Sequence, residues 1–381
     1  MARAGAASYY RLRRVVTRAA DRLTEWCDRH VRPAYAIRPA WLQERVRRWL
    51  LVVGSLARIV ALLPRLDATL LVGPSWRVVY VGDRTLFPEL VRALFPESVE
   101  TEALPRVAAW RLRVTVPALL ARADLVVCGL PAMWPARWRP DAAWRAEAPV
   151  MVEMVAALDG SSFADWLRRR PRTLRRTIAA AEAVGFSLRT THDFESLVQF
   201  HEELYLPHIR RRHSDLALTT TAEAQWRDWV AGTGELLLLD LGGRSVAGMT
   251  VAYHGPVVFL GEEGISDEIA GSPPGRRAQV ALKMHAIARA MARGQERLSI
   301  GRTLARRAHQ GFVHKQRWGG RPMLPDRSAY PTWTLLADRL PPSLSARLAA
   351  LALLDRSDLT RTILPPGGTP RLPDEARPLS P

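Results

Sequence analysis

Residues 291–320 read MARGQERLSIGRTLARRAHQGFVHKQRWGG, and the order of signals in this stretch decides the fold. Gly294 ends a helix, because glycine readily adopts the left-handed conformation that closes a helix C-terminus. A short strand is expected at 297–300, and the compact segment GFVHKQRWG follows at 311–319. The stretch therefore predicts a helix, a strand and a polar, aromatic segment in close succession.

The region before this stretch predicts an antiparallel meander and a crossover helix. Apolar runs at 235–241, 245–253 and 257–262 are separated by Gly242-Gly243 and His254-Gly255-Pro256, which are turn signals. Residues 279–293 carry an apolar stripe at helical spacing. A helical crossover favours a parallel return, so the strand at 297–300 should pair parallel to the third strand of the meander.

Further upstream, the pattern predicts helices and one strand that complete a domain over 150–330. A helix at 168–185 has Pro171 near its start and Gly185 as its stop. A strand at 186–191 and a helix at 193–209 follow.

The first part of the chain predicts a smaller α/β unit over 75–148. Strands are expected at 77–81, 108–115 and 123–129, with helices at 83–94 and 117–121. The segment 131–145 contains three prolines and predicts a linker.

The two ends of the chain carry different signals. Residues 8–70 favour helices, so 1–72 is expected to be a basic helical region, either a cap on the main domain or a face for an anionic membrane. At the other end, 331–381 predicts one helix over 333–353, interrupted by Pro341-Pro342, and a disordered proline-rich tail.

The signature at 311–319 resembles the "G-(aromatic)-x-x-K-x-(K/R)-(W/F)-G" tail of GNAT-type acyltransferases in their Fem-like branch. Two further stretches resemble Fem-type features: RRTIAAAEAVG at Arg175–Gly185 and YLPHIRRRH at Tyr205–His213. The resemblance covers about 162–321. It implies an α/β GNAT-like fold, doubled with a degenerate first half, and the transfer of an acyl group onto an amine.

The resemblance also implies where the donor binds. In this fold the last meander strand and the parallel strand splay apart to hold the acyl thioester, and the crossover helix starts at the pyrophosphate. The corresponding cofactor-binding residues are Gly271, Gly275, Arg276 and Arg277. Pro273 and Pro274 depart from the family pattern, because proline has no N–H to donate. Acetyl-CoA or another acyl-CoA is the expected co-substrate, and aminoacyl-tRNA is the alternative.

Attack on an acyl donor needs a neutral amine and therefore a base. Glu262 and Glu263 end the third meander strand, and strand alternation directs one of them into the cleft. Asp267, in the loop that follows, is a weaker candidate.

Lys315 is the third candidate catalytic residue. The 55 basic residues include only two lysines, Lys283 and Lys315, so a lysine at the position where relatives have lysine suggests a role in binding carbonyl or phosphate oxygen. Lys283 is expected to be a surface residue. His314 either shares the Lys315 site or is an ordinary histidine, and Trp318 is expected to pack in the core.

The net charge of +18 favours an anionic partner. We expect an amine acceptor, contact with an anionic membrane through the N-terminal helices, or tRNA, and no DNA. Cys27 and Cys128 form no C-x-x-C pair, so we expect no metal site and no disulfide framework. No secretory signal is evident, and the location expected is cytoplasmic or peripheral to the inner membrane face.

Other enzyme classes lack sequence support. The chain contains no G-x-x-x-x-G-K-[ST], G-x-S-x-G or H-E-x-x-H sequence, so a P-loop, a serine hydrolase and a zincin are not indicated. The function that the resemblance implies is that of an N-acyltransferase. A Fem-type aminoacyl-tRNA-dependent transferase and a non-catalytic GNAT-fold binding module are the alternatives.

Overall fold

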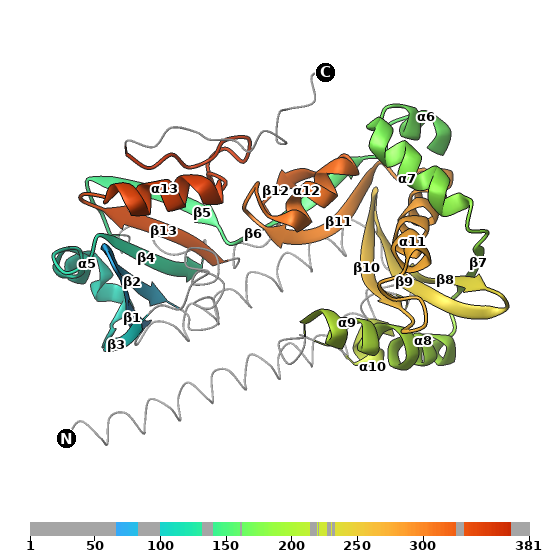
Figure 1. The fold of residues 1–381 in the computed structure, drawn as a ribbon, viewed down its shortest axis with the longest axis horizontal. Coiled ribbons are helices and arrows are strands. Elements are labelled where there is room, and N and C mark those ends of the chain that lie inside the picture. Colours follow the sequence, from blue (N-terminus) through green and yellow to red (C-terminus); the bar gives the residue numbers. More distant parts are fainter. Residues whose placement is uncertain are drawn as a thin grey trace. The chain divides into compact units, whose positions relative to one another are not determined.

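The computed structural model describes residues 66–82, 100–131, 140–160, 162–213, 219, 221–226, 230, 233–324 and 331–366 (Figure 1). Its contacts divide the chain into two units, the first of 1–152, 303–313 and 322–381 and the second of 153–302 and 314–321. This division differs from the predicted boundaries of 75–148 and 150–330, because two later segments join the first unit. The helices expected before residue 66 and at 83–94, and the tail beyond 366, lie outside the described residues.

A six-stranded sheet forms the first unit, in the order β3-β1-β2-β4-β13-β5. Its strands are β1 (Leu66–Gly73), β2 (Trp76–Gly82), β3 (Glu100–Val107), β4 (Leu125–Pro131), β5 (Trp144–Pro149) and β13 (Pro331–Ala337). β2 and β4 pair in parallel, and β1 pairs antiparallel with both β2 and β3. Strands alternate their side chains between two faces, and both faces of this sheet are apolar.

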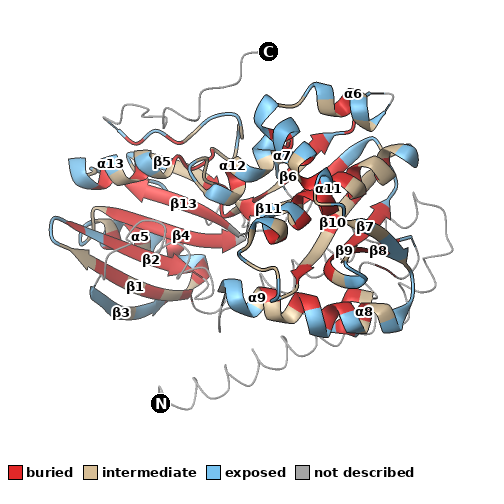
Figure 2. Ribbon diagram, turned by 45° about the vertical axis from the view of Figure 1, so that its right-hand side comes forward, coloured by how far each residue is buried: buried red, intermediate tan, exposed pale blue. Residues whose placement is uncertain are grey.

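Within the described ranges, one helix covers each face of the first sheet. The turn η3 (Ala109–Arg111) and helix α5 (Leu112–Leu120) cover one face through Leu112, Val116 and Leu119. Helix α13 (Pro342–Leu351) covers the other through Leu344 and Leu348, against Trp76 and Trp333. The strands between these helices are largely buried (Figure 2).

Three sequence-based predictions fail in the first unit. Residues 66–70 begin β1 and are not helical. The expected strand at 108–115 is η3 and α5, because Leu112, Val116 and Leu119 recur at helical spacing and are buried together. The expected helix at 333–353 begins as β13, whose Thr332–Leu336 segment pairs with both β4 and β5, and only 342–351 is helical.

A seven-stranded sheet, of order β12-β6-β11-β10-β9-β8-β7, makes up most of the second unit, although residues 151–152, 303–304 and 322–323 at its strand ends are counted with the first unit. Its strands are β6 (Met151–Ala157), β7 (Ser187–Thr191), β8 (Glu235–Leu241), β9 (Arg244–His254), β10 (Val257–Ile265), β11 (Arg297–Leu304) and β12 (Arg321–Met323). The predicted meander is confirmed as β8, β9 and β10, with Gly242 and Gly243 at positive φ in the first turn.

Helices cover both faces of the second sheet (Figure 1). The crossover helix α11 (Pro273–Ala292) packs on β8, β9 and β10, and α7 (Arg172–Glu182), which follows α6 (Phe163–Arg168), packs on α11. The other face is covered by α8 (Phe194–Phe200), the π-helical turn η5 (His201–Tyr205) and α9 (Leu206–His213), with α10 (Ala222–Gln225) following. α12 (Gln310–Arg317) contains the tail signature.

The predicted GNAT-like core is confirmed by this topology. Antiparallel β8, β9 and β10 lead through α11 into β11, which is parallel to β10. The first unit repeats part of this plan, since the β1–β2 hairpin is followed, after β3 and α5, by β4 parallel to β2. β5 and β6 are consecutive along the chain but belong to different sheets, and β13 returns to the first sheet after β12.

Candidate functional site

The site lies where β10 and β11 part in the second unit. Their parallel pairing covers Val257–Phe259 opposite Arg297–Ser299 and then ends. Beyond this point β10 has a bulge against β9, because its register shifts between Leu260 and Glu263. A bulge re-aims side chains and is common beside active sites. The predicted splaying of these two strands is therefore present, and its opening begins just before Glu262 and Glu263.

Glu262 lies in the bulge, with its backbone N–H donating to Thr250 Oγ1 at 2.9 Å. Burial raises the pKa of its carboxyl group, and a hydrogen bond with Tyr205 opposes that effect. Tyr205 is buried at the end of the π-helical turn, a feature frequent at functional sites. Glu262 is thus a desolvated carboxylate with raised proton affinity, a property expected of a general base.

Gly264 allows this helical turn to approach β10. A Cβ at Gly264 would lie 2.6 Å from the backbone carbonyl carbon of Leu204 and from the backbone nitrogen of Tyr205. Contacts that short do not occur, so any larger residue would push the turn away from the strand. Gly264 therefore fixes the approach that brings Tyr205 to Glu262.

Glu263 is held by an ion pair. Its Oε2 accepts from Lys283 Nζ at 2.7 Å, and the two side chains are 17% and 13% exposed. Burial alone would raise the pKa of Glu263, but the positive charge of Lys283, with smaller effects of His208 and Arg212, lowers it. Glu263 is therefore an ionised carboxylate, and Glu262 is the better candidate base. The other carboxylate oxygen of Glu263, Oε1, is buried and has no hydrogen-bond partner among the described residues.

Lys315 comes to the same place from α12. Its ammonium group donates to the carbonyl oxygen of Arg302 at 2.6 Å. Gly301, at φ +80°, leaves room for it, since a Cβ there would lie 3.4 Å from Lys315 Nζ. Burial and the charge of Lys283 lower the pKa of Lys315 to about 8, against the opposing effects of Glu153 and Glu263. Lys315 is therefore still mostly protonated at neutral pH.

Glu153 completes the cluster from β6. Its Oε1 accepts from Ser299 Oγ at 2.6 Å, which fixes the carboxylate beside the last residue of β11 that pairs with β10. The second unit thus brings together two lysines and two carboxylates, and we name Glu153, Glu263, Lys283 and Lys315 the lysine–carboxylate cluster. Opposite charges in a half-buried setting stabilise one another far more than they would in water.

The remaining predicted residues have different surroundings. His314 is exposed on α12, where partial desolvation and the charge of Lys283 lower the pKa of its imidazole to about 4, so it is neutral at pH 7. Trp318 is buried, as expected for a packing residue. Asp267 is exposed and paired with Arg211, which leaves it outside the cluster.

The predicted cofactor loop forms the start of α11. Pro273 and Pro274 occupy the first helical positions, where their missing N–H groups cost nothing. The N–H of Gly275 donates to the Ser272 side chain, and that of Arg276 to the Ser272 carbonyl. All four N-terminal positions of the helix thus lack a free N–H, and a pyrophosphate would find no backbone donor in the first turn.

The side chains of this loop offer one arginine for an anion. Arg276 donates to the carbonyl oxygen of Gly271 at 2.7 Å and so caps its own loop. Gly275 is required for packing, since a Cβ there would lie 2.2 Å from the Ile269 carbonyl oxygen. Arg277 is exposed. The residues present therefore do not fit the pyrophosphate cradle that the resemblance implies for coenzyme A.

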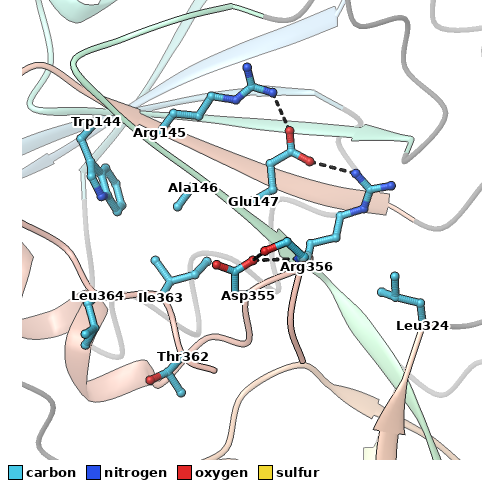
Figure 3. A pocket seen from close by; sticks show the side chains of 11 residues that line it. Trp144, Arg145, Ala146, Glu147, Leu324, Asp355, Arg356, Thr362, Ile363 and Leu364 are labelled. Atoms are coloured by element: carbon cyan, nitrogen blue, oxygen red, sulfur yellow. Dashed lines mark hydrogen bonds and ion pairs between the residues drawn. The ribbon is translucent and has the colours of Figure 1, made fainter. Parts of the chain in front are cut away.

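A groove of about 610 Å³ lies elsewhere, within the first unit (Figure 3). Its charged groups neutralise each other, because Glu147 binds Arg145 at 2.6 Å and Arg356 at 2.9 Å. Asp355 accepts from the backbone and the hydroxyl of Ser357. None of the predicted site residues lines this groove, and its charges are internally satisfied, so we assign it no chemistry.

Tyr205, Lys283 and Glu153 are site residues that were not predicted from the sequence. A signal for Lys283 was present, because it is the other lysine in an arginine-rich chain. Tyr205 opens the YLPHIRRRH stretch, although its role there was not foreseen. Glu153 carried no signal that could have singled it out. Among the described residues, no group of three or more His, Cys, Asp or Glu could hold a metal ion, and no helix is long and apolar enough to cross a membrane.

Comparison with protein families found no matching family, and no curated protein matched the sequence. Among solved structures, the chain is similar to FemX, at 12% identity and a TM-score of 0.39, over 74% of this chain and 91% of that one. It is also similar to L-PGS from Bacillus licheniformis, at 13% identity and a TM-score of 0.37, over 72% and 82%. A tandem GNAT protein from the clavulanic acid biosynthesis pathway aligns at 14% identity and a TM-score of 0.28, over 71% and 78%. At these TM-scores the fold assignment rests on the strand order of the chain itself.

Proposed function

We propose that this protein is an N-acyltransferase that moves an acyl group from an activated ester onto an amine at the opening between β10 and β11. The observation that carries the proposal is Glu262, a desolvated carboxylate with a raised pKa at the edge of that opening. Carboxylates whose pKa is shifted by desolvation are enriched at functional sites. The lysine–carboxylate cluster beside it adds the charges that an acyl-transfer site needs.

In the proposed reaction Glu262 acts as the general base. The acceptor arrives as an ammonium group, and the Glu262 carboxylate takes its proton. The amine nitrogen then attacks the carbonyl carbon of the donor, a C–N bond forms, and the bond from that carbon to the donor oxygen breaks. Glu262 gives this proton to the departing alkoxide, which leaves as an alcohol. The carboxylate then takes the second proton from the new amide nitrogen and releases it to water, so it is regenerated. Base catalysis of this kind contributes about 10²–10⁴-fold to rate.

Lys315 is the group proposed to stabilise the negative charge that develops on the carbonyl oxygen. Within the part of the chain that the structure describes, its ammonium makes one hydrogen bond, to the Arg302 carbonyl oxygen, which leaves two N–H groups for a ligand. Such a donor acts most strongly where water is excluded. Glu263 Oε1, buried and unpaired, is available to accept from the acceptor ammonium.

Between the two expected donors, the start of α11 favours aminoacyl-tRNA. An acyl-CoA brings a pyrophosphate that the prolines and capped N–H groups of α11 do not bind. An aminoacyl-tRNA brings an ester and a phosphodiester backbone, which arginines can bind. Arg172, Arg175 and Arg176 are exposed on α7, which packs on α11, and no ion pair is present for them among the described residues. These three arginines are the proposed phosphate contacts.

The test compares the two donors on the full-length protein. Filter retention with mixed aminoacyl-tRNA and melting curves with acetyl-CoA and longer acyl-CoAs measure binding. Loss of labelled amino acid from tRNA, with and without added primary amines, measures transfer. We expect tRNA retention that falls when Arg172, Arg175 and Arg176 are replaced by Gln, and amine-dependent loss of label that Glu262→Gln abolishes.

The opposite outcomes identify the alternatives. A melting shift with an acyl-CoA that disappears in the Arg276→Ala, Arg277→Ala double variant would restore coenzyme A as the donor. If neither donor binds and no amine releases label, the chain is a non-catalytic GNAT-fold binding module, and the transfer proposal is wrong.

A further inference from the structure

Helix α5 in the first unit presents apolar residues on two sides. Leu112, Val116 and Leu119 are buried against the sheet. On the opposite side, Val114 is 68% exposed, and Trp110, in the leading turn η3, is 52% exposed. Large apolar residues exposed at helical spacing on a helix that already has a buried face are not needed for its packing, and contiguous ones mark an interaction surface.

The exposed apolar residues form one continuous stripe. They lie at 110, 114, 117, 118 and 121, and all five are exposed: Trp110, Val114, Pro117, Ala118 and Ala121. At about 100° per residue, these positions span roughly a third of the helix circumference. We call this set the α5 stripe.

Arginines border the α5 stripe on both sides. By helical spacing Arg113 lies along one border, and Arg111 and Arg122 lie along the other. All three are exposed, and no ion pair is present for them among the described residues. The sequence from 103 to 123 contains no acidic residue. The surface is therefore apolar at its centre and positively charged along both edges.

The geometry points to the α5 stripe as a docking surface for an anionic lipid bilayer. Trp110, Val114 and Pro117 would enter the boundary between headgroups and acyl chains, where tryptophan is favoured. The arginine side chains would reach outward to lipid phosphates, as long cationic side chains do at interfaces. This inference is independent of the proposed acyl transfer and concerns the first unit alone.

Charge and polarity favour lipid over two other occupants. A nucleic acid would satisfy the arginines but would leave Val114, which is 68% exposed, against phosphates and sugars. A second copy of the chain, joined through a two-fold contact, would place like-charged arginine borders against each other. A bilayer with anionic headgroups complements both the centre and the edges.

Flotation of the full-length protein with lipid vesicles tests the inference. The vesicles are 1:1 phosphatidylglycerol and phosphatidylcholine, and phosphatidylcholine alone is the reference. We expect binding to the anionic vesicles that Trp110→Asp with Val114→Asp reduces at least tenfold. Replacing Arg113 and Arg122 by Gln should reduce it about fivefold for each charge removed. Leu364→Asp is the matched control, because Leu364 is 47% exposed and lies outside the stripe.

Trp110 and Val114 are exposed, so their variants should keep the melting temperature of the wild type. Unchanged flotation of the Trp110→Asp, Val114→Asp variant would overturn the inference, whatever the basic N-terminal residues contribute. Equal binding to both vesicle types would overturn its electrostatic part. A wild-type dimer that the double variant makes monomeric, without vesicle binding, would reassign the stripe to self-association.

Discussion

The two sheets contain the same local plan, and they differ in what happens after the parallel pair forms. In the first unit β2 and β4 stay paired from Val78–Leu125 to Gly82–Gly129, and the residues around them are apolar. In the second unit β10 and β11 pair only over Val257–Phe259 before they part, and charged residues occupy the opening. A closed pair needs only packing, whereas an open pair leaves backbone and space for a ligand.

Side chains explain how the first pair stays closed. The Tyr80 ring lies over Gly129, where a Cβ would be 2.2 Å from the Tyr80 hydroxyl oxygen. Cys128 beside it is fully buried, and burial raises the pKa of its thiol to about 12, so it is unreactive at neutral pH. The first unit thus has an apolar interior around its parallel pair, where the second unit has Glu262 and the lysine–carboxylate cluster. This difference identifies the second unit as the one to test for chemistry.

The largest effect is expected at Glu262. Glu262→Gln keeps the shape but removes the proton acceptor, and it should lower kcat/KM about 10²–10⁴-fold. The active form is the carboxylate, so wild-type activity should fall as the pH falls through a pKa raised above the ordinary glutamate value. Rates of amine-dependent donor consumption, measured across pH, test this.

The same substitution, Glu262→Gln, should raise the stability of the folded protein although it lowers the activity. A carboxyl group with a raised folded-state pKa binds its proton more tightly in the folded state, so it costs stability as the pH rises through that pKa. Glu262→Gln should therefore melt at a higher temperature than the wild type at pH 7. Loss of activity together with a lower melting temperature would mean that Glu262 is structural.

Breaking the Lys283–Glu263 pair should be the second largest effect. Lys283→Met leaves a buried carboxylate without its partner, which typically costs about 3–5 kcal/mol. Glu263 has a lowered pKa, so its contribution is present above the unfolded-state pKa and is lost as the pH falls through the folded-state value. Urea unfolding at pH 7 and at pH 4 measures both.

A matched double variant sharpens the test of this pair. Lys283→Met combined with Glu263→Leu removes both charges, and it should recover most of the lost stability. If Lys283→Met alone is neutral at pH 7, the pair is solvated and the second unit is not the charged interior described above.

The contacts that keep β2 and β4 paired in the first unit should affect the free energy of unfolding and not the catalytic rate. Gly129→Ala forces a Cβ against the Tyr80 hydroxyl and should cost about 1–3 kcal/mol by overpacking. Catalytic rate per folded molecule should not change, because the reacting groups lie in the second unit. If circular dichroism shows that Gly129→Ala is fully folded and its catalytic rate is nevertheless reduced, the first sheet contributes to catalysis and this assignment is wrong.

The smallest effect is expected for Lys315→Arg. Arginine keeps the charge but replaces a compact donor by a planar fork, so kcat/KM should fall about tenfold while the fold remains. A melting temperature equal to that of the wild type is the control for folding. If the activation free energy derived from kcat/KM changes by less than about 0.5 kcal/mol, Lys315 has no catalytic role and is an ordinary partly buried lysine.

Sequence patterns predicted the second unit well because its elements are local. Glycine turns separate the meander strands, so β8, β9 and β10 were foreseen near their observed bounds. The apolar stripe of α11 identified that helix, but it begins at Pro273, six residues before the predicted start at 279. The parallel return of β11 followed from handedness and crossover length. The opening beside Glu262 was expected only through resemblance, and the bulge that creates it has no sequence signal.

The predictions for the first unit were wrong where tertiary contacts override the local sequence pattern. Residues 108–115 alternate apolar and charged types as strands do, yet they form α5 and its leading turn, because both sides of that helix carry apolar residues. β13 pairs with strands about 200 residues earlier in the chain, which no local window detects. Lys283 lies on α11 and Lys315 on α12, so their proximity is also a tertiary contact. Neither segment of sequence predicts it.

The placement of β13 has a consequence for synthesis on the ribosome. The first sheet cannot be completed until residues 331–337 have emerged, although its neighbours β4 and β5 were made much earlier. At about 5–20 residues per second, β4 and β5 wait roughly ten seconds or longer with an unpaired edge between them. During that interval the nascent chain therefore exposes two unpaired strand edges that could pair with other chains. A chain cut at residue 330 would lose β13, the strand that joins β5 to β4 in the first sheet, rather than a dispensable tail.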